Sequence, residues 1–210
     1  TVTGGRGYAD GGGMYTKNSK LTVSNCVFYD NHALYRGGGM ANESSALTVT
    51  GCVFEDNRVG PLDENAYVGP NWGARGGGMY NHGGYDGWES SVVQDCTFRR
   101  NRVSRASGAA WIGGGGMCNE DHSPIIDRCI FERNWARGSG VIGGGMFSYA
   151  AAPTVTNSVF ADNWATQAGG AVATLGRDTI VNCTFYGNGW ESSPSGGTRI
   201  RTEAGGAIYE

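Results

Sequence analysis

The tetrapeptide "GGGM" at Gly11–Met14 comes back four more times along the chain, each time ahead of a short apolar run. The further copies lie at Gly37–Met40, Gly76–Met79, Gly114–Met117 and Gly143–Met146. Two copies that differ at the third and fourth positions follow, "GGAV" at Gly169–Val172 and "GGAI" at Gly205–Ile208. Self-similarity of this kind is the signature of a repeat protein, in which each repeat is one structural unit.

A second motif, Phe followed by two variable residues and Asn, extends each repeat. The stretch "LTVSNCVFYDN" at Leu21–Asn31 matches "LTVTGCVFEDN" at Leu47–Asn57, and four further copies end at Asn101, Asn134, Asn163 and Asn188. Met14 and Met40 are 26 residues apart, as are Met146 and Val172, while insertions lengthen the other repeats. A period in the mid-twenties, with short β-branched runs and no helical periodicity, is typical of a β-solenoid.

We therefore predict an all-β fold, a single-stranded right-handed parallel β-helix of about six to seven coils with loop insertions, forming one domain over residues 1–210. Side chains alternate along a strand, so Cys26 and Phe28 should point inward and Val27 outward. Stacked coils then build columns of like side chains. The expected columns are aromatic (Phe28, Phe54, Phe98, Phe131, Phe160, Phe185), aliphatic (Met14, Met40, Met79, Met117, Met146, Val172, Ile208) and amide (Asn31, Asn57, Asn101, Asn134, Asn163, Asn188).

The asparagines and the glycines are both expected at corners of the coil. Each Asn amide can bond the next one about 4.8 Å away, and Asn tolerates a left-handed bend. Glycine serves where φ is positive or where close approach of the backbone excludes a Cβ. GGGM is thus a corner followed by a core residue. It is not a phosphate loop, because no helix and no Lys-Ser/Thr pair follows it.

Five of the six cysteines occupy one column, two residues before the phenylalanine. They are Cys26, Cys52, Cys96, Cys129 and Cys183, and Ser158 fills the remaining copy. This spacing favours free, buried thiols, although the even number leaves a disulfide framework as the alternative. Cys118 lies off the column, and the sequence has no CxxC zinc motif. His32, His82 and His122 are isolated and are expected at the surface or in loops.

The repeats resemble those of the right-handed parallel β-helix proteins, and in motif they are most similar to the chlamydial polymorphic membrane proteins, whose repeats carry FxxN and GGAI. Here FxxN stands at Phe28–Asn31 and in five further copies, and "GGAI" stands verbatim at Gly205–Ile208. The resemblance implies an extracellular or cell-surface location and an adhesive role. This chain departs from that pattern, since GGGM replaces GGAI in five copies.

Composition limits the partners. The formal net charge is −3 with no basic block, so we expect no nucleic-acid partner. No apolar run approaches the roughly 18 residues of a membrane helix, so no membrane span is expected. The partners that we expect instead are flanking β-helix segments, a second copy of the chain, surface carbohydrate or, as the resemblance implies, a host or cell-surface protein.

The two residues between Phe and Asn point outward, and stacking the copies gives two columns that contain charged residues. One column reads Glu55, Arg99, Glu132 and the other Asp30, Asp56, Arg100, Arg133, Asp162. A polysaccharide lyase would need clustered carboxylates for Ca²⁺ beside an arginine that takes a proton. The columns alternate in sign, which neutralises charge rather than concentrating it. We therefore predict a non-catalytic structural or adhesive module without a cofactor; a polysaccharide lyase with Ca²⁺ is the alternative.

Tryptophans are the other candidate contact residues. Four of them fall in variable stretches and two share a column after the asparagines, and the full set is Trp72, Trp88, Trp111, Trp135, Trp164 and Trp190. Exposed rings could stack on sugars or contact a partner, which would make the chain a sugar-binding β-helix without catalysis. The alternative is that they cover the sheets.

Both ends of the chain lie inside a repeat. "TVTG" at Thr1–Gly4 reads like "TVTG" at Thr48–Gly51, and the closing "GGAIYE" lacks the strand that follows it in other copies. We expect either a segment of a longer β-helix or end-to-end assembly of copies into a filament, because uncapped coils expose strand edges.

Overall fold

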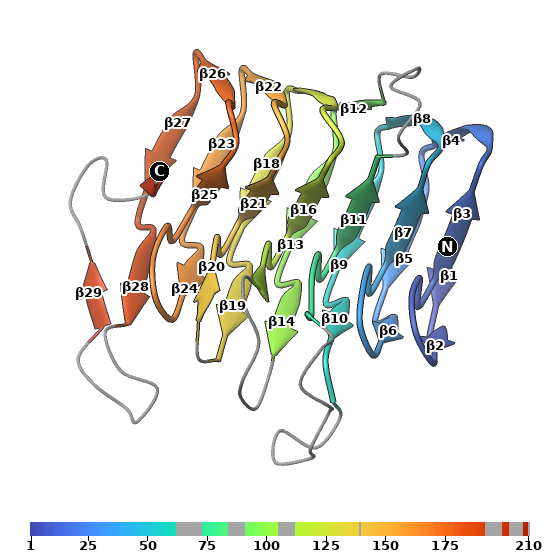
Figure 1. Cartoon of the computed structure of the whole chain (residues 1–210), viewed down its shortest axis with the longest axis horizontal. Coiled ribbons are helices and arrows are strands. Elements are labelled where there is room, and N and C mark those ends of the chain that lie inside the picture. The colour runs from blue at the N-terminus through green and yellow to red at the C-terminus, as the bar shows by residue number, and fades with distance from the viewer. Residues whose placement is uncertain are drawn as a thin grey trace.

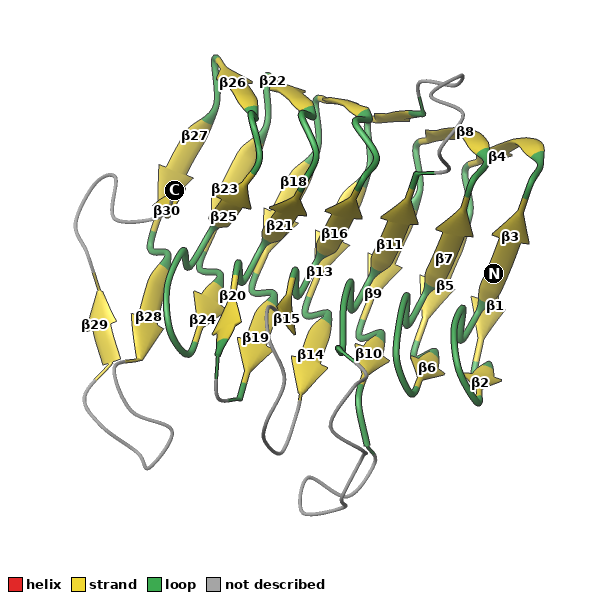
Figure 2. Cartoon of the chain, in the orientation of Figure 1, coloured by secondary structure: helices red, strands yellow, loops and turns green. Residues whose placement is uncertain are grey.

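The computed structural model describes residues 1–61, 73–83, 91–104, 112–138, 140–191, 199–201 and 208–209, and the statements below concern these residues. Within them the chain winds through successive coils that stack along the long axis of the molecule from the N-terminus to the C-terminus (Figure 1). The coils consist of short strands joined by loops and turns (Figure 2). The predicted all-β solenoid is confirmed, and the strand numbers of the sheets agree with about six to seven coils.

Each coil passes through four sheets in a fixed order, named here the Phe sheet, the outer sheet, the Met sheet and the Val sheet. Every pairing between coils is parallel in the described residues, and β28 also pairs antiparallel with β29. The first two sheets are as follows. The Phe sheet contains β1 (Val2–Thr3), β5 (Val27–Tyr29), β9 (Val53–Glu55), β13 (Thr97–Arg99), β18 (Ile130–Glu132), β23 (Val159–Ala161) and β27 (Thr184–Tyr186). The outer sheet contains β2 (Arg6–Gly7), β6 (His32–Ala33), β10 (Arg58–Val59), β14 (Arg102–Ser104), β19 (Trp135–Arg137), β24 (Trp164–Ala165), β28 (Gly189–Glu191) and β29 (Arg199–Arg201).

The other two sheets complete the coil. The Met sheet contains β3 (Met14–Lys17), β7 (Met40–Glu43), β11 (Met79–His82), β16 (Met117–Glu120), β21 (Met146–Tyr149), β25 (Val172–Leu175) and β30 (Ile208–Tyr209). The Val sheet contains β4 (Lys20–Ser24), β8 (Ala46–Thr50), β12 (Val92–Gln94), β17 (Ile125–Asp127), β22 (Thr154–Thr156) and β26 (Thr179–Val181). A pair of short strands, β15 (Ile112–Gly113) and β20 (Val141–Ile142), lies in the return from the outer sheet to the Met sheet.

The main core fills the space between the Phe, Met and Val sheets. The phenylalanines pair in register from coil to coil, with ring centroids 4.6–5.0 Å apart and near-parallel planes. Met40, Met79, Met117 and Met146 are fully buried opposite them, and the Val sheet contributes Val49, Val93 and similar residues. Alternation along each strand sets this packing, because one face of every strand points into the core.

The asparagine column runs beside the phenylalanines at the end of the Phe sheet. Asn57 donates to the Asn101 side-chain oxygen at 3.0 Å and to the Phe28 carbonyl at 2.8 Å, and its own oxygen accepts from the backbone and the side chain of Asn31. All four hydrogen-bonding positions of the amide are used, so burial leaves none of its donors or acceptors without a partner. The left-handed residue lies one position earlier than predicted, at Asp56 (φ 54°) and its equivalents, and not at the asparagine itself.

The GGG triplets lie at a neck where the chain leaving the Phe sheet and the chain entering the Met sheet pass each other. The first glycine has positive φ, as at Gly76 (φ 64°). At the second, Gly77, a Cβ would lie 2.3 Å from the Gly115 carbonyl oxygen and 2.8 Å from the Arg102 backbone. A Cβ on the third, Gly78, would lie 3.1 Å from the Asn101 amide. The corner prediction is right, and its cause is backbone contact from two sides.

Beyond the neck, each coil forms a second, smaller layer. The inner face of the outer sheet packs its small apolar residues against Ala74 and Val141 of the return segments, the stretches that lead back to the Met sheet. The next residue in one of these returns, Ile142, packs instead against Phe147 on the outward face of the Met sheet. The return segments are therefore sandwiched between two sheets, and they bury the outward face of the Met sheet.

Ion pairs and hydrogen bonds link the return segments to one another and to the Met sheet. Arg36 binds both carboxylate oxygens of Asp10 at 2.8–3.0 Å and lies over the Tyr80 ring at 5.3 Å. Arg75 pairs with Glu120 at 3.2 Å, and Glu120 also accepts a hydrogen bond from Tyr80. These groups are linked one to the next, from Asp10 through Arg36, Tyr80 and Glu120 to Arg75, so they form a network rather than isolated surface pairs.

Two sequence-based expectations are wrong. Val2 pairs with Phe28, so the strand at the start of "TVTG" belongs to the Phe sheet and does not correspond to Thr48–Gly51, which lies in and after β8 of the Val sheet. Of the histidines, His32 and His122 are buried rather than at the surface. His32 donates to the Gly60 carbonyl at 2.5 Å, and the His122 ring nitrogen lies 2.9 Å from the Ser91 hydroxyl. Both side chains find these partners through contacts between coils, which spacing along one coil does not reveal.

Replacing Phe98 by Ala should lower the free energy of unfolding by about 3–5 kcal/mol, because it opens a cavity in the middle of the stacked rings. Thr97 is the matched control, since it lies next to Phe98 in β13 and faces outward. Thr97→Ala should cost about 1 kcal/mol or less. Urea titrations of the two variants measure the difference, and equal losses would show that the strand faces are assigned the wrong way round.

Replacing Gly77 by Ala should destabilise the protein far more than replacing Gly4. Both substitutions add one methyl group, but the Gly77 methyl would overlap backbone atoms on two sides, whereas a Cβ on Gly4 (φ 66°) has no atom within 4 Å. Gly4→Ala should therefore show only the left-handed strain, about 1–2 kcal/mol. Thermal unfolding followed by circular dichroism compares the two variants. If Gly77→Ala were as stable as Gly4→Ala, the close backbone contact described at Gly77 would be contradicted.

Stability should fall as the pH drops below about 6.5, the ordinary pKa of histidine. Burial lowers the pKa of His122 and of His32 in the folded protein, so below that pH the unfolded chain binds more protons than the folded one. Urea titrations between pH 8 and 5.5, above the range where most carboxylates titrate, measure this slope. The double variant His32→Gln, His122→Gln should flatten it; an unchanged slope would contradict the assignment to these two side chains.

Candidate functional site

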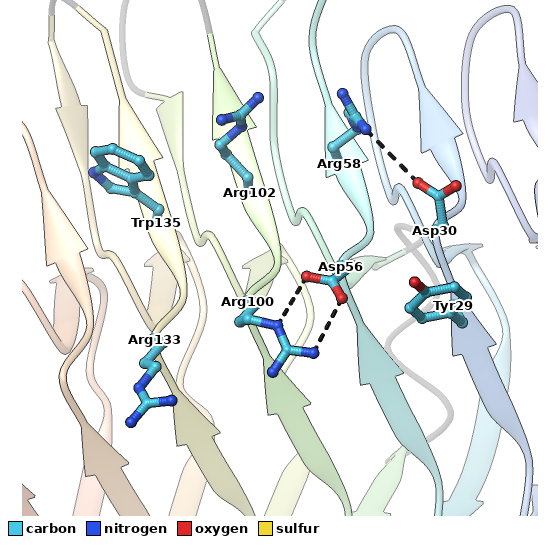
Figure 3. Close-up of a pocket in the computed structure, with 8 residues that line it drawn as sticks. All are labelled: Tyr29, Asp30, Asp56, Arg58, Arg100, Arg102, Arg133 and Trp135. Carbon is cyan, nitrogen blue, oxygen red and sulfur yellow. Dashed lines mark hydrogen bonds and ion pairs between the residues drawn. The ribbon is translucent and has the colours of Figure 1, made fainter.

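An open groove of about 560 Å³ runs along the outside of the corner between the Phe sheet and the outer sheet (Figure 3). Eight residues from four successive coils line it. They are Tyr29, Asp30, Asp56, Arg58, Arg100, Arg102, Arg133 and Trp135. Four arginines against two aspartates leave a formal surplus of two positive charges in a chain whose net charge is −3.

The corner geometry places these side chains. The residue before each buried Asn has positive φ, as at Asp56, Arg100 and Arg133, and this left-handed bend turns its side chain away from the core. The residues after Asn57, Asn101 and Asn134 begin strands of the outer sheet, so Arg58, Arg102 and Trp135 pair in register, and all three line the groove. In Figure 3 the second set forms one row and the first set lies beside it.

Each aspartate of the groove lies against an arginine. Arg100 donates two hydrogen bonds to the Asp56 carboxylate, at 3.0 and 3.1 Å, and also contacts Glu55. Arg58 lies 3.7 Å from Asp30. At the edge of the groove Arg99 bonds Glu55 at 2.6 Å, and this hydrogen bond lowers the pKa of Glu55, which is therefore ionised at neutral pH. Two of the pairs predicted from the sequence are therefore found across coils, Glu55 with Arg99 and Asp56 with Arg100, but the second column does not alternate, because Asp30 precedes Asp56 and Arg100 precedes Arg133.

The charge is unevenly distributed along the groove. Both aspartates lie in its N-terminal half, whereas Arg100, Arg102 and Arg133 meet Trp135 at the other end. Arg133 is 62% exposed and lies 3.5 Å from Glu132, outside the groove. Arg137 lies over the Trp135 ring at 5.8 Å. This end of the groove therefore combines guanidinium groups and an indole from two adjacent coils.

The tryptophans proposed as surface contacts fall into two groups. Trp135 and Trp164 pair in adjacent strands of the outer sheet and are half-buried. Trp72, Trp88 and Trp111 lie outside the described residues, as does the side chain of Trp190 in β28. Of the two tryptophans whose side chains the structure describes, Trp135 lines the groove and Trp164 does not.

The cysteine column serves the structure. All six cysteines are free. Cys52, Cys96 and Cys129 are buried as predicted, whereas Cys26 and Cys183 at the two ends of the column are half-buried, and Cys118 is buried among the outward residues of the Met sheet. Backbone amides of one coil donate to the sulfur of the next, as from Cys52 to Cys96 at 3.4 Å, and Ser158 accepts in the same way from Cys129. A hydrogen bond with Cys129, together with burial, raises the pKa of Cys96 to about 12, so this thiol is protonated and unreactive at neutral pH.

Sequence reasoning missed two features of this region. Arg58 and Arg102 were not singled out, although both directly follow the asparagine of the Phe-x-x-Asn motif. A second buried polar column lies two residues after the methionines, where Asn81 donates to Asn119 at 2.9 Å. Its members are Thr16, Asn42, Asn81, Asn119, Ser148 and Thr174. The recurring Met-x-Asn of three copies was the available signal.

In the described part of the chain, no group of three or more His, Cys, Asp or Glu side chains is placed to hold a metal ion. Nor does that part include a helix long and apolar enough to cross a membrane. The Ca²⁺ site of the lyase alternative stays a prediction.

Comparison with known proteins identifies the fold family and no individual relative. Neither curated proteins nor solved structures gave a match. A family model described as "Right handed beta helix region" matches residues 2–138 and 63–190, which together span most of the sequence. With the parallel coils and the stacked columns above, this match shows that the chain belongs to the right-handed β-helix family.

Proposed function

We propose that this chain is a non-catalytic module of an extracellular or cell-surface protein, in which the β-helix is a rigid scaffold and the corner groove is a contact surface for a ligand or partner. One observation carries the proposal: the carboxylates of the groove lie against arginines. The similarity of the repeats to those of surface-exposed adhesive proteins supports the location.

The pairing works against lyase chemistry at this groove. An arginine that takes a proton from substrate must first lose its own, and the hydrogen bonds with Asp56 raise the pKa of Arg100 further. Asp56 in turn has both carboxylate oxygens engaged by Arg100, which leaves it a poor ligand for Ca²⁺. The same contacts suit a surface that binds without turnover, because they hold the side chains in fixed positions before a ligand arrives.

Incubation with polygalacturonate, alginate or chondroitin, with and without Ca²⁺, should give no rise in the ultraviolet absorbance of unsaturated uronates. Arg100→Ala and Arg128→Ala serve as a matched pair of variants. Arg100 pairs with Asp56 in the groove, and Arg128 pairs with Asp95 in the same two-bond geometry at another corner. A rise that disappears in Arg100→Ala and persists in Arg128→Ala would assign the chain to the polysaccharide lyases.

A further inference from the structure

The outward face of the Phe sheet, here called the Phe face, consists of two columns of side chains that flank the buried phenylalanines. The strand register gives their order from coil to coil. The first column is uncharged and β-branched throughout: Val27, Val53, Thr97, Ile130, Val159 and Thr184. The second column has a tyrosine at each end and charges in the middle: Tyr29, Glu55, Arg99, Glu132, Ala161 and Tyr186. Three of these side chains are large, apolar and well exposed, namely Ile130, Tyr29 and Tyr186.

The Phe face is flat enough to pack against another flat face along its whole length. The phenylalanine rings directly beneath it lie within 7° of parallel from one coil to the next, at spacings of 4.6–5.0 Å, so the sheet has little twist. Adjacent strands of an ordinary sheet are rotated by roughly 20–25°, so two such sheets diverge away from their point of contact. Here the columns stay aligned, and a contact made at one coil can be repeated at the next.

The second column reads almost the same in both directions from a point midway between Arg99 and Glu132. A second copy turned by 180° about an axis through this point, parallel to the strands, has its helix axis antiparallel to the first and sets each column against itself. Arg99 then lies opposite Glu132 of the second copy, and Glu132 lies opposite its Arg99. Tyr29 and Tyr186, at the two ends of the column, lie opposite one another in the same way.

The first column fits the same rotation. Thr97 lies opposite Ile130 of the second copy, and Val53 lies opposite Val159. β-Branched side chains therefore meet β-branched side chains along the whole column. Their burial supplies the apolar part of the contact, next to the ion pairs of the second column.

The corner between the Val sheet and the Phe sheet adds a second complementary pair. Within one chain, Arg128 donates to both carboxylate oxygens of Asp95 at 2.8 and 3.0 Å. The rotation brings Asp95 opposite Arg128 of the second copy, because the two residues lie at equivalent left-handed positions on the two central coils. The four charges then alternate in sign around the axis, and each keeps its partner within its own chain.

We propose that the Phe face binds the Phe face of a second copy of this chain, with antiparallel helix axes and the twofold axis midway between Arg99 and Glu132. Such a contact is isologous, because both copies use the same patch, and association therefore closes at a dimer. The inference goes beyond the proposed function, since it assigns a partner to a surface other than the corner groove.

Charge also sets the edge of the contact. Glu55 lies opposite Ala161 of the second copy, so no like charges meet within the second column. At the groove corner, however, the same rotation would set Arg100 opposite Arg133. The interface therefore ends short of this corner, and the groove stays open in the dimer.

Other arrangements of the two faces are opposed by their charges. A shift of the second copy by one coil sets Arg99 against Arg99, or Glu132 against Glu132. Parallel helix axes set the first column against the second, which covers Arg99 with Thr97 and Glu132 with Ile130. Like charges face to face and charges covered by apolar groups both disfavour association, so the sequence of the columns specifies one register and one orientation.

Charge reversal tests the central ion pair. Arg99→Glu sets two glutamates against each other and Glu132→Arg sets two arginines against each other, so each variant alone should dimerise about tenfold or more weakly. In an equimolar mixture the new glutamate faces the new arginine, and the unaltered Glu132 faces the unaltered Arg99. The mixture should therefore dimerise within about threefold of the original protein. Lys17→Glu is the matched control: it also breaks a pair between coils, with Glu43 at 2.9 Å, but on the Met sheet, and it should leave association unchanged.

Two isoleucines provide a second test that changes no charge. Ile130 on the Phe face and Ile125 on the Val sheet are almost equally exposed, at 43% and 44%. Ile130→Asn should weaken dimerisation about tenfold, because the side chain lies beside the axis, where the contact is most completely buried. Ile125→Asn should leave dimerisation unchanged.

Sedimentation velocity of the full chain over a range of concentrations measures the association, after circular dichroism has shown each variant folded. A reversible dimer of twice 22.1 kDa that each charge reversal weakens and their mixture restores supports the inference. A monomer at every concentration, a mixture that associates no better than either variant, or equal effects of Lys17→Glu and Arg99→Glu would overturn it, as would equal effects of the two isoleucine variants. Species that grow beyond the dimer and do not respond to Arg99→Glu would also overturn it, because they would show contact through the ends of the stack.

Discussion

The close passage of two backbone segments at the neck of each coil is the constraint from which the rest of the structure follows. The second glycine of every triplet lies against the residue after the buried asparagine, as Gly77 does against Arg102. Any side chain there would push the two segments apart. The neck divides each coil into a main core, which contains the phenylalanines, and a smaller layer formed by the outer sheet and the return segments. It also fixes where the corner groove can form, since the residues on either side of the asparagine are forced outward.

The buried asparagines stabilise the neck, because their side chains form hydrogen bonds with backbone groups at the turn that would otherwise have no partner. Each amide ties the end of the Phe sheet to the coil before it and to the coil after it, as Asn57 does through Phe28 and Asn101. Cysteine and serine do the equivalent at the other end of the Phe sheet, at the corner that follows the Val sheet, where a sulfur or hydroxyl oxygen accepts a hydrogen bond from a backbone amide of the neighbouring coil. Serine and cysteine are interchangeable in that column because both can accept this hydrogen bond.

Much of the fold could be predicted from the sequence, because every repeat has the same alternation of inward-pointing and outward-pointing side chains. Phe28 and its equivalents, the methionines and the asparagines fall where alternation and spacing place them. What could not be predicted depends on contacts between segments that the repeat does not align. The buried state of His122 depends on Ser91 of another coil. The strand at Val2 was assigned to the wrong sheet because "TVTG" is too short a match to distinguish two β-branched strands. In the groove, the pairing of Asp56 with Arg100 could be predicted from the sequence. Arg58 and Arg102 were missed, because a single coil does not show that the residues before and after the asparagine line the same groove.

The asparagine column also gives the stack a direction. Each side-chain amide nitrogen from Asn31 to Asn163 donates one hydrogen bond to the asparagine oxygen of the coil that follows and one to a backbone carbonyl of the coil before. The bonds between side chains therefore all run in one direction. The aligned amides form a polar vector along the helix axis, much as peptide groups do along an α-helix. A coil added in the same sense extends the vector, whereas a coil added in the reverse sense would bring two carbonyl oxygens or two amino groups face to face. The direction of the amide column thus favours contacts of matching polarity over reversed ones wherever another β-helix coil stacks on this core.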